Sequence, residues 1–209
     1  MTFGLVKHNN NSISAITSAG QLAQGKMTLI KEQTASSSAS ISFVDGTSSV
    51  VLDSTYPIYL FKFINIHPAT NSTAFRFNLS TDSGSNYNVT KTTTVIQYYH
   101  DEAGSATALQ YDTGMDLAQS TNPQIIAENI GNGNDECASG DMYLFSPSST
   151  TFVKHFLISS ASYFASDYSN NYYVGGYGNT TSAVDAVQFT MSSGNIDAGT
   201  IKLYGIKGS

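Results

Sequence analysis

The chain has 209 residues and a formal net charge of −6 at pH 7, and only 11% of its residues are charged. Because Arg76 is its single arginine, it lacks the clustered cations that phosphate backbones require, which excludes nucleic-acid binding. No apolar run approaches 18 residues, so no membrane-spanning helix is expected, and the lone Cys137 excludes an internal disulfide framework. A hydrophobic content of 40% favours a folded domain over disorder.

The first 26 residues differ in composition from the rest of the chain. They are mostly small and polar, with too few apolar residues to fill a core of their own. We interpret residues 1–26 as an extended arm that becomes ordered on contact with a partner; the alternative is a simple frayed terminus. The apolar stretch in "MTFGLVKHNNN" is too short for a signal peptide, so synthesis in the cytoplasm is expected. If the arm docks on a partner, its anchors are the spaced apolar residues Phe3, Leu5, Val6, Ile13, Ile16 and Leu22.

Residues 27–209 predict an all-β domain. Helical periodicity is nearly absent, and short runs of β-branched and aromatic residues are separated by clusters of Gly, Asn, Asp and Ser. About ten short antiparallel strands are typical of a two-sheet sandwich of the jelly-roll type. The expected strands, in chain order, are 27–33, 40–44, 57–66, 74–80, 93–100, 123–130, 141–147, 151–160, 171–177, 185–191 and 199–207.

Alternation along two of these strands predicts which faces are buried. In "YLFKFINI" (59–66) both faces are mostly apolar, which indicates a central strand or one covered on both sides. In "FRFNLS" (75–80) the aromatic residues share one face, and Arg76, Asn78 and Ser80 share the other. The second strand is therefore expected to have one face in water.

The histidines do not predict a metal or catalytic site. Histidines 8, 67, 100 and 155 are scattered, and none has ligand spacing to another His or to Cys. The stretch "YYHDEAG" (98–104) is the most catalytic in appearance, because it gathers His100, Asp101 and Glu102 at a strand end. Adjacent strand residues point to opposite faces, so these three side chains are not expected to converge.

The loop "GNGNDECASGD" (131–141) is rich in oxygen ligands and is an alternative candidate for calcium. It lacks the spacing of a calcium-binding loop, so a solvated acidic loop is the preferred interpretation. Cys137 in this loop has no histidine near it in sequence that could act as its base. No nucleophile, zinc or phosphate-binding motif is present, and no pair of carboxylates is singled out for glycoside hydrolysis. We therefore expect no enzyme activity, no cofactor and no metal.

Tyrosine is the most informative residue type. Thirteen are present, and many cluster in residues 162–179. Tyrosine combines a rigid ring with a polar tip, so it suits interfaces, although burial of alternate members in the core is the simpler reading for at least half of them. The candidates for a subunit interface or a glycan contact are Tyr163, Tyr168, Tyr172, Tyr173 and Tyr177.

Several framework stretches resemble one group of viral proteins. These are residues 27–70, then "STDSGSNYN" (80–88), "FSPSSTTFVKHF" (145–156) and "NTTSAVDAVQFTMSSGNIDAGTIKLYGIK" (179–207). They are similar to virion-associated proteins of tailed bacteriophages, particularly aquatic and marine ones. The resemblance covers about residues 27–207 and carries no catalytic residues. It implies a jelly-roll-like β-sandwich displayed on the virion surface.

Two functions follow from this resemblance. The first is a capsid decoration (cement) protein that binds the major capsid protein or other virion proteins and stabilises the head. The second is a tail, fibre or baseplate-associated module that contacts host surface glycans. In either case many copies would multiply modest contacts by avidity, and closed symmetry, with a homotrimer favoured, is expected.

Overall fold

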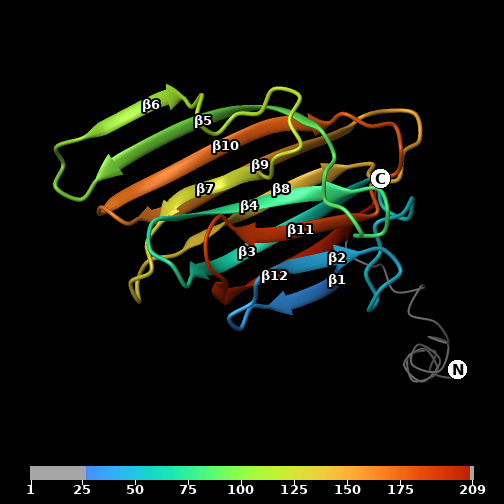
Figure 1. Cartoon of the computed structure of the whole chain (residues 1–209), viewed down its shortest axis with the longest axis horizontal. Coiled ribbons are helices and arrows are strands. Elements are labelled where there is room, and N and C mark those ends of the chain that lie inside the picture. The colour runs from blue at the N-terminus through green and yellow to red at the C-terminus, as the bar shows by residue number, and fades with distance from the viewer. Residues whose placement is uncertain (1–26, 208–209) are drawn as a thin grey trace, which may run out of the picture.

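The computed structural model describes residues 27–207 as an all-β domain with antiparallel pairing throughout (Figure 1). The predicted arm, with its six apolar anchors, lies outside the described residues. No helix is present in the part of the chain that the structure describes. The strands are β1 (Met27–Thr34), β2 (Ile41–Val44), β3 (Ile58–Pro68), β4 (Thr73–Ser80), β5 (Lys91–Asp101), β6 (Thr107–Tyr111), β7 (Gln124–Ile130), β8 (Ala138–Phe145), β9 (Lys154–Phe164), β10 (Tyr168–Gly178), β11 (Ala186–Met191) and β12 (Ile196–Ile206).

The strands form two runs that belong to one continuous, nearly closed array. The longer run has the order β1-β12-β3-β8-β9-β10-β5-β6, and the shorter run has the order β7-β4-β11-β2. A single residue pair, Ile130 on β7 with Phe164 on β9, joins the runs in the ladder. Figure 1 shows β6 and β1 at opposite edges of the longer run.

The core lies between the two runs and is rich in phenylalanine. Phe189 of β11 is fully buried, and its ring centroid lies 5.4 Å from that of Phe61 and 5.2 Å from that of Phe63, both on β3. Phe77 of β4 meets Phe156 of β9 edge to face at 5.1 Å. Because these strands are not neighbours in the ladder, the rings hold the two runs together by packing rather than by backbone hydrogen bonds.

A bulge in β3 and an unusual backbone conformation in the facing strand change which side chains of β3 point into the core. Asn65 has a positive φ of 50°, and the register with β8 shifts between Phe63 and Ile66. On the facing strand β12, Gly199 has a φ of +116°, and a Cβ built on it would lie 2.6 Å from the Asn65 carbonyl oxygen. The bulge turns Ile66 into the core, where it is fully buried, whereas Ile64 stays exposed.

The prediction that β4 has one face in water is wrong. Asn78 is 6% exposed and Ser80 is fully buried. The Asn78 side-chain amide donates to the carbonyl oxygens of Tyr87 at 2.6 Å and Thr121 at 3.0 Å, so connecting loops cover this face. Local alternation within β4 could not reveal this cover, because it comes from loops outside the strand.

Two lysines are buried on strands that flank β10. Lys91 at the start of β5 and Lys154 at the start of β9 both pair with Gly178 of β10, and both are fully buried. The Lys91 ammonium donates to the Val89 carbonyl oxygen at 2.8 Å and to Asn78 Oδ1, and the Lys154 ammonium donates to the Phe152 carbonyl oxygen at 2.6 Å. These acceptors are neutral, so burial lowers the pKa of both lysines, that of Lys91 to about 8.

Candidate functional site

The face of the longer run that points away from the core carries the exposed apolar side chains. Ten large hydrophobic residues are exposed in the described chain, and all except Phe152 lie on strands of this run. Five of them form a compact group on its β10-β5-β6 side. Cross-strand pairing aligns Tyr173 with Ile96 and Tyr111, and Tyr98 with Leu109. These five residues are called the aromatic patch below.

The aromatic patch is well exposed. Leu109 is 76% exposed, and its four companions are each between 42% and 50% exposed. One carboxylate adjoins the patch, that of Asp116, which accepts from the Tyr111 hydroxyl at 2.7 Å. Two ion pairs lie on the other half of the run. Lys202 meets Glu32 at 3.0 Å, and Lys62 meets Asp141 at 3.9 Å. The face therefore has one half with ion pairs and one half with the five apolar and aromatic side chains of the patch, and the second half is the candidate protein-binding surface.

A depression of about 590 Å³ lies at one end of this face. Cross-strand pairing aligns His100 of β5 with Ser169 of β10, and Ser169 with Tyr163 of β9. The Tyr163 backbone N–H donates to the Cys137 carbonyl oxygen at 2.9 Å, which brings the 131–141 loop to the same row. The two stretches considered separately in sequence, 98–104 and 131–141, therefore line one pocket.

His100, Asp101 and Glu102 all line this pocket, against the expectation that they would not converge, but the two carboxylates have different hydrogen-bond partners. Asp101 is buried, and its carboxylate accepts from the backbone N–H groups of Ser105 and Ala106, each at 2.8 Å. These hydrogen bonds and that of the Ser105 hydroxyl lower the pKa of Asp101. Glu102 accepts instead from the Tyr163 hydroxyl at 2.9 Å, which raises the pKa of Tyr163. The Asp101 carboxylate therefore closes the turn that follows β5, although the residue also lines the pocket.

Cys137 lines the same pocket but is not activated as a nucleophile. Burial raises the pKa of its thiol, so the thiolate is disfavoured near neutral pH. Its sulfur lies 4.0 Å from Asn65 Oδ1, and the described residues give it no hydrogen bond to a histidine. His100 and Cys137 line the same depression, although they are far apart in sequence. They do not form a hydrogen-bonded pair of nucleophile and base.

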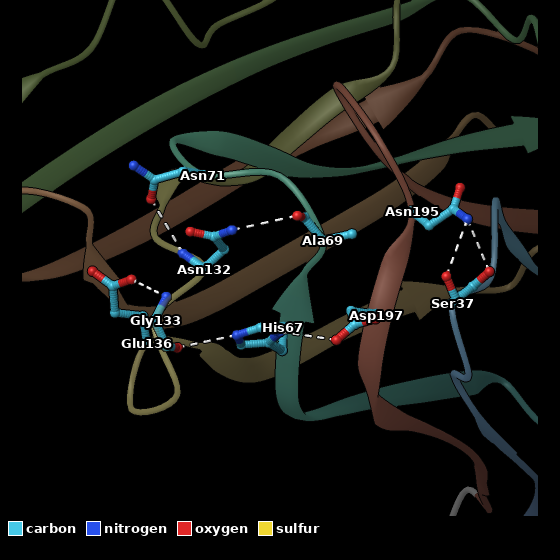
Figure 2. Close-up of polar contacts among 9 residues, drawn as sticks. All are labelled: Ser37, His67, Ala69, Asn71, Asn132, Gly133, Glu136, Asn195 and Asp197. Atoms are coloured by element: carbon cyan, nitrogen blue, oxygen red, sulfur yellow. Dashed lines mark hydrogen bonds and ion pairs between the residues drawn. The ribbon is translucent and has the colours of Figure 1, made fainter.

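The loop considered for calcium uses its polar groups on itself and on its neighbours (Figure 2). The Glu136 carboxylate accepts from the Gly133 backbone N–H. A ring nitrogen of His67 lies 3.1 Å from the Gly133 carbonyl oxygen, and the other lies 3.6 Å from the Asp197 carboxylate. Asp141 is paired with Lys62. Within residues 27–207 no group of three His, Cys, Asp or Glu side chains is placed to hold a metal ion.

The five predicted tyrosines occupy different environments. Tyr172 is fully buried, and its hydroxyl accepts from the Asn170 amide at 2.7 Å, so its assignment to a contact surface is wrong. Tyr173, the next residue, is 46% exposed and belongs to the aromatic patch. Tyr177 packs against His155 at 5.9 Å, and Tyr168 lies on the core side of β10. Alternation separated Tyr172 from Tyr173 but could not say which of them faces the core.

Most of the aromatic patch was missed in the sequence. Tyr98 and Ile96 fall in an expected strand, but Leu109 and Tyr111 lie on β6, which was not expected. The alternation of Thr107, Leu109 and Tyr111 with Ala108 and Gln110 in "TALQY" was the available signal. This stretch is short and contains no Val or Ile, so its pattern alone does not distinguish a strand from a loop.

In the described part of the chain, no helix is long and apolar enough to cross a membrane. Comparisons with protein-family models, with curated proteins and with solved structures return no match to this chain.

Proposed function

We propose that the chain is a non-enzymatic structural protein of a bacteriophage virion and that it decorates the capsid surface. The observation that carries the binding role is the aromatic patch, a group of five exposed apolar and aromatic side chains on the outer face of the longer run. Exposing such side chains to water is unfavourable unless a partner covers them, and tyrosine-rich patches are typical of protein interfaces. The partner we propose is the major capsid protein or another virion protein.

The assignment to a virion rests on the sequence resemblance of residues 27–207. The proposal includes the finer architecture that the resemblance implies: a jelly-roll-like two-sheet sandwich with an extended N-terminal arm over residues 1–26. It also includes assembly as a homotrimer, because a many-copy surface protein gains from closed symmetry and avidity.

The experiment that tests this function is labelling of intact particles through a C-terminal tag, with the copies counted by position. Dense, regular labelling of the head supports decoration, and absence of label from head and tail contradicts a virion role. The patch is tested by Ile96→Ser with Leu109→Ser, which should reduce incorporation into particles. Phe152→Ser is the matched control, because Phe152 is 72% exposed but lies outside the strand run.

A tail, fibre or baseplate-associated module that contacts host glycans is the second candidate. The observation that favours it is the presence of three exposed tyrosines, Tyr98, Tyr111 and Tyr173, in the patch, since tyrosine rings stack against sugar rings. Label confined to the tail would support this candidate over decoration.

A further inference from the structure

A second pocket lies on the opposite side of β5 and β10 from the aromatic patch. It has a volume of about 320 Å³, at the lower end of the size range of small-molecule sites. β5 supplies Gln97 and Tyr99, and β10 supplies Tyr168 and Asn170. Glu128 of β7 and the end of β9 with its following turn complete the lining, with Phe164 and Ser166.

The buried amides of this pocket are already hydrogen-bonded to their neighbours. Gln97 Nε2 donates to Asn170 Oδ1 at 3.1 Å, and Asn170 Nδ2 donates to the Tyr172 hydroxyl at 2.7 Å. Gln97 Oε1 accepts from Gln110 Nε2 at 2.8 Å. Gln97 and Asn170 are 6% and 2% exposed, so this network is a rigid polar floor and offers few free donors to a ligand.

Glu128 is the group that lacks a partner. Within residues 27–207 its carboxylate makes no hydrogen bond or ion pair, although the side chain is half-buried. Burial raises the pKa of Glu128, and the negative charge of Asp112 adds to the effect. A cation next to the carboxylate would oppose both causes, because an opposite charge stabilises the ionised form.

Three aromatic rings stand beside this carboxylate. Tyr168 meets Tyr99 at a centroid distance of 5.5 Å and an interplanar angle of 78°, and it meets Phe164 at 5.7 Å and 68°. The rings are steeply inclined to one another, so they do not make the flat platform on which a sugar ring stacks. Aromatic faces carry negative potential and attract cations, most of all cations with methyl groups that desolvate easily.

We propose that this pocket binds an organic ammonium ion, of the alkylated or methylated type, with Glu128 as its counter-ion and the Tyr99, Phe164 and Tyr168 rings as its walls. A metal ion is disfavoured, because the described residues place no three ligating side chains together. A saccharide is disfavoured, because the amides that would bind its hydroxyl groups are already bonded to each other. The inference does not depend on the proposed virion function.

The test is calorimetric titration of the full chain with choline and with its neutral carbon analogue, 3,3-dimethylbutan-1-ol. Saturable binding of choline, at least about tenfold tighter than the analogue, is expected, since only choline carries the charge that the carboxylate and the rings recognise. Equal affinity for the two molecules, or absence of saturable binding, would overturn the proposal. Competition by a neutral monosaccharide would overturn it in favour of a sugar site.

Variants then locate the binding. Glu128→Gln should reduce the affinity for choline and narrow its advantage over the neutral analogue to the part that the rings supply, and Tyr168→Leu should reduce the affinity about 2- to 30-fold. Glu32→Gln is the matched control, because it removes the same charge from β1, outside the pocket, and should leave the affinity unchanged. Equal losses in Glu32→Gln and Glu128→Gln would mean that net charge alone attracts choline. If Glu128→Gln does not fold, the comparison of the two ligands on the unaltered chain still decides.

Discussion

The buried Lys91 should make the stability of this protein depend on pH in an alkaline window. Its pKa is about 8 in the folded chain, against an ordinary lysine value of 10.5, because burial disfavours the charged form. Between these two values the unfolded chain binds more protons than the folded chain, so the free energy of unfolding rises with pH there. The gap corresponds to about 3 kcal/mol, gained between pH 8 and 10.5 and absent below pH 8.

The assay is urea denaturation of the unaltered protein and of Lys91→Met at several pH values from 7.5 to 10.5. The difference in unfolding free energy between the two proteins should change by about 3 kcal/mol in favour of the unaltered protein as the pH rises. Other groups that titrate in this range contribute to both proteins and cancel in the difference. A difference that stays constant across the window would refute the assignment of a lowered pKa to Lys91.

A control separates the titration of Lys91 from a general effect of lost stability. Val187→Ala removes fully buried apolar atoms from β11 and changes no titratable group. It should lower stability by an amount that does not vary between pH 8 and 10.5. A pH dependence in Val187→Ala that matches that of Lys91→Met would assign the effect to weakened packing instead.

Three substitutions test the packing, the bulge and the pocket floor, and one reactivity assay on the unaltered protein tests the thiol. Phe189→Ala should cost about 3–5 kcal/mol in urea denaturation, because its ring joins the two runs, and a loss below about 1 kcal/mol would contradict that role. Gly199→Ala should cost at least about 1–3 kcal/mol, since its positive φ and the nearby Asn65 carbonyl both oppose a Cβ; unchanged stability would argue against the bulge. Tyr172→Phe should cost about 1–2 kcal/mol through the lost acceptor for the Asn170 amide, and a neutral effect would mean that the network does not hold. Cys137 should react with iodoacetamide more slowly than free cysteine at pH 7 and accelerate at high pH, whereas a rate above that of free cysteine would indicate an activated thiolate.

The strands were largely predictable from the sequence, because their signal is local. Each expected strand overlaps an observed one, and the pattern of 59–66 correctly indicated a central strand, since β3 pairs with both β12 and β8. The missed strand, β6, is short and pairs only with β5, so its residues face water and lack the apolar enrichment that marks a buried strand. The covered face of β4 was missed for a related reason, since its cover comes from other segments.

The candidate sites were less predictable, because they depend on cross-strand register. His100 and Tyr163 are 63 positions apart, and only the pairing of β5 and β9 with β10 brings them to one depression. Glu128 was not a candidate, since an isolated glutamate in a strand has no local signature. Its carboxylate lacks a partner because of the residues that surround it in the folded chain, and these come from other strands.

The single pair that joins the two runs, Ile130 with Phe164, makes one corner of the array mechanically weak. Ala165 N–H donates to the Asn129 carbonyl oxygen at 2.9 Å beside it, whereas β9 and β10 pair along their whole length. Thermal opening should therefore begin at this corner, with faster hydrogen exchange at Ala165 than at Val174 in the middle of β10. Since Phe164 is also a wall of the second pocket, opening of this corner would alter one wall of that pocket while β9 and β10 stay paired.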